Sequence, residues 1–198
     1  MISRTRRHIV CPRTARGWYA WLQRNHDRRS GIWLRCYKAA AARTNLDWDQ
    51  AVDAALCFGW IDSVRYTHDA DSYVQYFSPR KARSPWSRVN KEKIERLREQ
   101  QLMAPAGLAA VATARENGSW YWLDSAERDE IPADLQEELA RHAGAAPFVS
   151  DLSPSRRKLL LHWICLARRP ETRRKRIAEI GRCAAARVMP ERFQVGEE

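Results

Sequence analysis

The residues of this sequence that could carry chemistry are concentrated in residues 58–90. Ser84 and Ser87 are both good caps for the start of a helix, and Arg80 directly follows a strand-like run that ends in proline. Free backbone N–H groups, the positive end of a helix dipole and nearby guanidinium groups together favour an anion. The segment therefore predicts an anion or ligand contact, and the alternative is a capped surface helix with solvated charges.

One acid belongs to the same segment. Asp62 follows Trp60 at the start of a predicted strand, where it could pair with Arg80 or Arg65, or act as a general base. Pairing is the commoner role of a carboxylate beside arginines. We expect a basic, anion-favouring cleft whose ligand-binding residues are Trp60, Asp62, Arg80, Ser84, Trp86, Ser87 and Asn90.

No catalytic or metal-binding set can be assembled from the other reactive side chains. His68 and Asp69 resemble a base with its orienting acid, but adjacent residues in a turn rarely share a pocket. His162 and Cys165 are three apart on a predicted helix, and no second pair completes a metal site. The sequence predicts no catalytic residue, no metal and no cofactor.

The C-terminal part carries many basic side chains. They are Arg168, Arg169, Arg173, Arg174, Lys175, Arg176 and Arg182. We expect Lys175 and Arg182 to face away from the apolar stripe of their helix, and Arg173, beside that stripe, to hold two helices together. The alternative is a helix–turn–helix on nucleic acid, but the connection lacks a glycine and the first helix is as basic as the second. An electrostatic surface is the favoured interpretation.

The net charge of +11 is unevenly distributed. Residues 1–29, 80–98 and 154–183 have net charges of +7, +6 and +8, while residues 116–138 have −7. Three basic blocks around one acidic block suggest an anionic partner, internal pairing or both, and solubility is the alternative explanation. We expect an anionic small molecule or a protein as partner, and nucleic acid only as a lesser alternative.

Length and composition limit the class of protein. A chain of 198 residues fits one large domain or one domain with a helical appendage. No apolar run approaches the ~18 residues of a membrane helix, and the apolar stretch near the N-terminus is too short for a secretory signal. The five cysteines are odd in number and widely spread, which predicts free thiols. We therefore expect a cytoplasmic protein without a transmembrane segment.

Hydrophobic periodicity and turn residues predict the elements that must position these side chains. Strands are expected at 32–38, 61–67 and 72–77, and residues 120–123 are either a last short strand or aromatic packing. Helices are expected at 14–25, from a cap at Asn45 or Asp47 to residue 58, from about Ser84 or Ser87 to residue 101, and at 105–116, 132–141, 154–168 and 170–187. The last helix has an apolar stripe of Ile177, Ile180, Ala184 and Val188.

The predicted fold class is α+β, mostly helical, with a small antiparallel sheet of about three to four strands and a C-terminal helical pair. The expected organisation is a basic tail at 1–13, a core domain at 14–141, a linker at 142–152, a C-terminal helical segment at 153–188 and a tail at 189–198. His142 to Ser150 is small, loose and interrupted by Gly144 and Pro147, which is typical of a linker.

Several strings in this chain resemble the bacterial YdeI/OmpD-associated family, also called bacteriocin-protection proteins. The similar strings are residues 18–25, 31–34 (GIWL), 51–62 (AVDAALCFGWID), 77–80 (FSPR), 84–87 (SPWS) with Asn90, 103–108 (MAPAGL), and 168–173 (RRPETR) with Arg176-Ile177. The resemblance covers most of positions 14–185. It implies a small α+β protein whose C-terminal helical segment is the OmpD-associated module, linked to resistance against bacteriocins or cationic peptides and to a porin. It brings no catalytic residues.

The leading hypothesis is a non-enzymatic stress-protection protein with a ligand-binding cleft. The alternatives are an enzyme that acts on an anionic small molecule at the same cleft, with Asp62 as base, and a nucleic-acid binder that uses the C-terminal arginines. A protein of charge +11 should repel cationic peptides, so any protection is expected to run through a partner or an anionic ligand.

Overall fold

A computed structural model describes residues 8–194 of the chain, so the ends of the expected tails, residues 1–7 and 195–198, lie outside the described residues. The chain divides into two compact units. The N-terminal unit contains residues 1–84 and 89–119, and the C-terminal unit contains residues 85–88 and 120–198. The division therefore lies at other points than the expected linker at 142–152.

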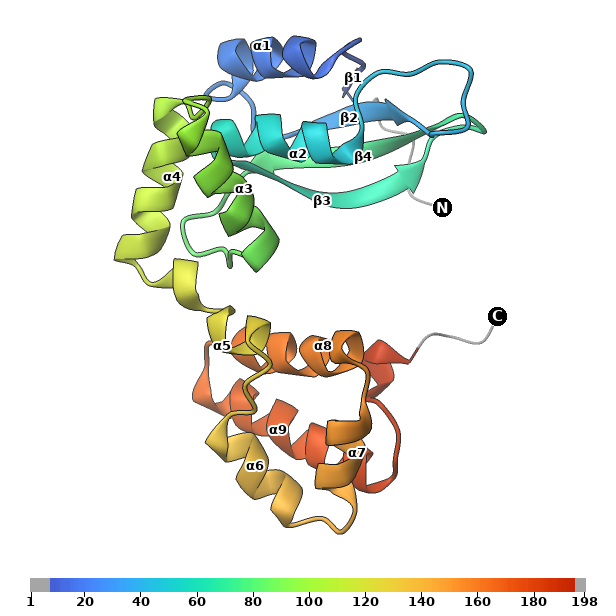
Figure 1. Cartoon of the computed structure of the whole chain (residues 1–198), viewed down its shortest axis with the longest axis vertical. Coiled ribbons are helices and arrows are strands. Elements are labelled where there is room, and N and C mark those ends of the chain that lie inside the picture. The colour runs from blue at the N-terminus through green and yellow to red at the C-terminus, as the bar shows by residue number, and fades with distance from the viewer. Residues whose placement is uncertain (1–7, 195–198) are drawn as a thin grey trace. The chain divides into compact units, whose positions relative to one another are not determined.

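The N-terminal unit is built on a sheet that has four strands within the described residues, in the order β1-β2-β4-β3 (Figure 1). The strands are β1 (Ile9–Val10), β2 (Ile32–Tyr37), β3 (Trp60–Thr67) and β4 (Ser72–Pro79). The expected antiparallel hairpin forms, and β4 also pairs antiparallel with β2. The sheet is nevertheless mixed, because β1 pairs parallel with β2 from within the segment expected to be a tail.

The helices of this unit are α1 (Ala15–Asn25), α2 (Trp48–Cys57), α3 (Arg88–Glu99, apart from Arg88 itself) and α4 (Pro105–Glu116). The first two begin at side-chain caps. The Thr14 hydroxyl accepts a hydrogen bond from the Gly17 amide at 3.1 Å. Asp47 and Gln50 form a reciprocal capping box at the start of α2. Such caps satisfy amides that would otherwise lack a partner in the first turn, which stabilises each helix.

Helices α1 and α2 cover one face of the sheet (Figure 1). Side chains at alternate positions of β2, Ile32 and Leu34, are buried on this face. Trp18 of α1 is fully buried and meets the ring of Phe77 edge to face, with 5.6 Å between ring centroids. This aromatic and aliphatic layer is the core that positions the helices.

The C-terminal unit is helical within the described residues. Its elements are α5 (Asp124–Glu127), α6 (Ala133–Ala140), α7 (Ala145–Asp151), α8 (Pro154–Cys165), α9 (Pro170–Ala185) and the short 3-10 helix η2 (Glu191–Phe193). Helix α9 contacts α6, α7 and α8. Its buried side chains Ile177, Ile180 and Ala184 belong to the hydrophobic core of this unit.

Residues 145–151 of the expected linker form α7, because Ala145 and Val149 insert into the hydrophobic core. Of the two alternatives for the aromatic run at 120–123, the structure shows aromatic packing and no strand: residues Ser119–Tyr121 form the 3-10 helix η1, and Trp120 packs against Trp86. Packing against a core stabilises such short helices, and the turn residues of a segment do not predict it.

Among the described residues, no helix is both long enough and apolar enough to span a membrane. All five cysteines are free, as expected.

Candidate functional site

The structure gives Asp62 two hydrogen-bond donors. Its Oδ2 accepts from the indole nitrogen of Trp48 at 3.0 Å and from the side-chain amide of Gln75 at 3.3 Å. Trp48 opens α2 and Gln75 lies in β4, so this carboxylate ties a helix to the sheet. These two donors are a tryptophan and a glutamine, and the expected pairing of Asp62 with Arg80 or Arg65 stays a prediction.

Arg80 follows β4 and is largely buried. Its backbone amide donates to the Gly59 carbonyl at 2.9 Å, which places the side chain beside the first residues of β3. Burial lowers the pKa of Arg80 to about 10, and the negative charge of Asp62 acts in the opposite direction. The guanidinium stays protonated at neutral pH, so Asp62 and Arg80 form an electrostatically coupled pair in the fold.

The other predicted site residues divide between the two units. Trp60 is buried and its indole donates to the His26 carbonyl at 3.3 Å, which is a core contact. Ser84 and Asn90 belong to the N-terminal unit, whereas Trp86 and Ser87 belong to the C-terminal unit. Trp86 is buried there against Trp120, with 5.0 Å between ring centroids. A ligand site made from all seven residues stays a prediction.

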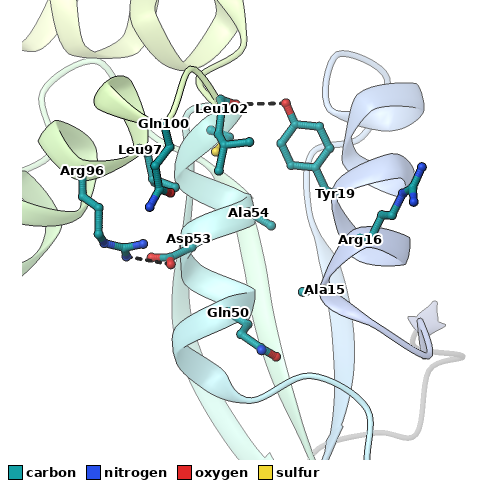
Figure 2. A pocket seen from close by; sticks show the side chains of 11 residues that line it. Ala15, Arg16, Tyr19, Gln50, Asp53, Ala54, Arg96, Leu97, Gln100 and Leu102 are labelled. Atoms are coloured by element: carbon teal, nitrogen blue, oxygen red, sulfur yellow. Dashed lines mark hydrogen bonds and ion pairs between the residues drawn. The ribbon is translucent and has the colours of Figure 1, made fainter.

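A cavity of about 390 Å³, which sequence reasoning missed, lies over α2 (Figure 2). We call it the α2 groove. It is lined by Ala15, Arg16 and Tyr19 from α1, by Gln50, Asp53, Ala54 and Cys57 from α2, by Arg96 and Leu97 from α3, and by Gln100 and Leu102 from the turn that follows. All these residues belong to the N-terminal unit. The interior is mainly apolar, and the charged and amide side chains are polar groups around it.

Small side chains create the groove. Ala54 and Cys57 are three residues apart on α2, so they lie on the same side of the helix and leave space between α1 and α3. At one end of this space, the Tyr19 hydroxyl donates to the Leu102 carbonyl at 2.9 Å (Figure 2). The signal in the sequence is the row of alanines and one cysteine in AVDAALC, whose small side chains leave room beside the helix.

Ion pairs fix the α3 side of the groove. The ammonium of Lys93 is buried and lies 2.6 Å from Asp49 and 2.8 Å from Asp53. Asp53 also accepts from Arg96 at 2.7 Å (Figure 2). The positions of α2 and α3 are therefore defined by a network of charges instead of a single contact.

The Cys57 thiol in the groove is not activated as a nucleophile. Burial raises the pKa of Cys57 to about 12, and Asp53 contributes in the same direction. The sulfur is thus protonated at neutral pH, and a thiol is a poor nucleophile compared with a thiolate. Cys57 acts here as part of an apolar wall.

In the C-terminal unit, Glu127 connects three groups. Its carboxylate pairs with the Lys158 ammonium, lies 3.4 Å from His162 Nε2 and accepts from the Arg88 amide at 3.3 Å. Burial opposes ionisation of Glu127, but these partners outweigh it and lower its pKa. Burial also lowers the pKa of His162, despite the nearby carboxylate.

The basic side chains of α9 have mixed roles. Arg173 does not join α8 to α9: its guanidinium forms two hydrogen bonds, of 2.6 and 2.8 Å, to Asp134 at the start of α6. Arg174, Lys175 and Arg182 are exposed. Within residues 8–194, no group of three or more His, Cys, Asp or Glu side chains could hold a metal ion.

Two protein-family models match the chain. One, described as a domain of unknown function (DUF8412), matches residues 10–110. The other, described as bacteriocin-protection, YdeI or OmpD-associated, matches residues 129–187. The searches of curated proteins and of solved structures returned no match.

Proposed function

The chain belongs to the family of a domain of unknown function (DUF8412) and carries a YdeI/OmpD-associated segment. On that premise we propose that it is a non-enzymatic protein that binds a small molecule in the α2 groove. The supporting observation is the groove itself. An apolar cavity of about 390 Å³ with a few polar groups is the usual form of a small-molecule site.

Charge favours an anionic ligand. Arg16 and Arg96 lie on opposite sides of the groove, on α1 and α3, and both have exposed side chains. The net charge of +11 adds an attractive long-range field for anions. Arg96 is paired with Asp53, which also lines the groove, so Arg16 is the lining cation that we assign to an anionic ligand.

A role in bacteriocin protection is part of the proposal, with a limit on its mechanism. Direct capture of cationic peptides is disfavoured by the positive net charge. We infer that protection runs through the bound small molecule or through a protein partner. Binding of a cationic antimicrobial peptide by the purified chain, measured at low and high salt, checks this inference: tight, salt-sensitive binding would contradict it.

Filling the groove tests the proposed site. Ala54→Trp places a large side chain in the cavity, and Ala54→Leu is a milder version in case the first variant fails to fold. The matched control is Ala109→Trp, an exposed alanine of α4 that does not line the groove. Circular dichroism checks the fold of each variant.

A thermal-shift screen of carboxylates, phosphates and alcohols supplies the readout, because a ligand of the native state raises the melting temperature. We expect the shift to be lost in the folded Ala54 variants and kept in Ala109→Trp. A ligand that shifts all the folded variants equally binds elsewhere, and that result would refute the groove as the site.

A further inference from the structure

Tyr19 stands between two cavities of the N-terminal unit. Besides the α2 groove, it lines a second cavity of about 430 Å³ whose apolar wall is formed mainly by Phe58, Met103 and Pro105. One stripe of α1 serves both cavities: Arg16 and Tyr19 line the first, while Tyr19, Gln23 and His26 line the second. Spacings of three and four residues place these side chains on the same helix face. The two cavities are therefore consecutive along one face of α1.

Two contacts hold Tyr19 where it lines both cavities. Its ring meets the Phe58 ring edge to face, with 4.8 Å between ring centroids, and its hydroxyl donates a hydrogen bond to the Leu102 carbonyl. Leu102 lies in the irregular turn between α3 and α4, next to Gln101, whose φ of 58° is in the left-handed region. A bond that ends on a short non-helical turn can be replaced by a ligand without unwinding either helix.

We propose that the α2 groove and the second cavity form one site for a single-chain amphiphile with an anionic headgroup, whose chain displaces the bond between Tyr19 and Leu102. This inference rests on the proposed function of the groove. Arg16 and His26, the C-cap of α1, are ten positions apart, which corresponds to ~15 Å along the helix axis, so a ligand chain must be long to fill both cavities.

The ends of the combined site differ in chemistry, and this difference orients the ligand. Arg16 is exposed at the groove and has no ion pair within residues 8–194, whereas Arg96 is already paired with Asp53. Figure 2 shows Arg16 extending from α1 away from α2, so a headgroup that pairs with it would lie at the outer edge of the groove. The second cavity offers Phe58, Met103 and Pro105, which suit a hydrocarbon tail.

Binding of dodecanoate, hexanoate and dodecylammonium to the full chain, measured by calorimetry below micelle-forming concentrations, tests the proposal. We expect dodecanoate to bind at least tenfold more tightly than hexanoate, since each buried methylene adds to affinity. Dodecylammonium, which has the same chain and the opposite charge, should bind at least tenfold more weakly than dodecanoate. The substitution Arg16→Gln should weaken the binding of both dodecanoate and hexanoate.

Three variants separate the two cavities. Met103→Trp, or Met103→Phe if the first does not fold, should remove most of the difference in affinity between dodecanoate and hexanoate. The affinity for hexanoate should stay unchanged. Tyr19→Phe removes only the hydroxyl, and we expect it to strengthen dodecanoate binding about fivefold, because the bond to Leu102 no longer competes. Ala54→Trp should weaken the binding of both dodecanoate and hexanoate.

The outcomes distinguish this inference from the function on which it rests. If hexanoate binds as tightly as dodecanoate and the Met103 variants change nothing, the groove binds a ligand but does not extend past Tyr19, and the inference fails alone. Equal binding of dodecylammonium refutes the anionic headgroup. If Ala54→Trp folds and changes no binding, the groove is not the site and both proposals fail.

Discussion

Oδ2 of Asp62 lies 3.0 Å from the indole nitrogen of Trp48, so a strand residue accepts a hydrogen bond from the first residue of α2. The same oxygen accepts from Gln75. Asp62 therefore links α2 to the sheet. Its negative charge also stabilises the protonated form of the nearby Arg80 guanidinium.

Replacing Asp62 by Ala should therefore destabilise the fold. The variant loses two hydrogen bonds and leaves the buried side chain of Gln75 with one acceptor fewer, so we expect a loss of about 1–2 kcal/mol in the free energy of unfolding. Urea denaturation measures it. His68→Ala, on an exposed residue of the neighbouring turn, is the control and should change stability little; a stable Asp62→Ala protein would contradict the structural role.

Lys93→Met tests the ion network between α2 and α3. The ammonium is buried between Asp49 and Asp53, and its removal leaves two carboxylates with fewer partners. We expect a loss of about 2 kcal/mol in the free energy of unfolding, below the full cost of a buried pair because Asp49 is exposed. Arg98→Met breaks only the exposed pair with Glu95 and should cost less than about 1 kcal/mol. Equal effects of the two substitutions would argue against the network.

Gly107→Ala tests how closely α4 approaches α2. A Cβ atom at this position would lie 2.3 Å from the Cys57 carbonyl oxygen, so the two backbones would have to move apart. We expect a loss of about 2–3 kcal/mol, as for other overpacked cores. Gly17→Ala in α1 is the matched control: its Cβ meets only ordinary contacts at 3.5 Å or more, and alanine should stabilise the helix by about 0.5–1 kcal/mol. Thermal unfolding compares them, and a Gly107→Ala protein as stable as wild type would rule out the close approach.

The stability of the C-terminal unit should fall below about pH 6.5. Burial lowers the pKa of His162 below its ordinary value of 6.5, so the unfolded chain binds the proton more readily than the folded one. Stability therefore rises with pH through this range and is lost as pH falls from 6.5 through the lowered pKa. Glu127, whose pKa is also lowered, adds a further loss below its ordinary value of 4.5.

His162→Gln should flatten the upper part of this profile, because glutamine does not titrate. Urea midpoints measured at steps of pH between 5 and 7.5 provide the check. His142, which lies 3.2 Å from Glu138 on α6, offers the control variant His142→Gln. An unchanged slope between pH 5 and 6.5 in His162→Gln would show that another group causes the acid sensitivity.

Part of the fold could be predicted from the sequence because its signals are local. Thr14 caps α1 as expected, Asp47 is the one of two expected caps that starts α2, and α4 has the predicted bounds, starting at Pro105. The spacing of Ile177, Ile180 and Ala184 correctly identified the buried face of α9, but Val188 is exposed because the helix ends at Ala185. A cap or an amphipathic stripe depends on residues a few positions apart, so the sequence states it directly.

The sequence by itself determined the α+β class, the α1 cap and the hairpin, while the tertiary structure decided what those elements enclose. The short strand β1, the helix α7 and the α2 groove all depend on packing between segments distant in the sequence. Tyr19 and Leu102 are 83 residues apart, and nothing near either residue indicates that they meet. A cavity is the space left by several helices together, so only the tertiary structure could place a candidate site at the alanines and the cysteine of α2.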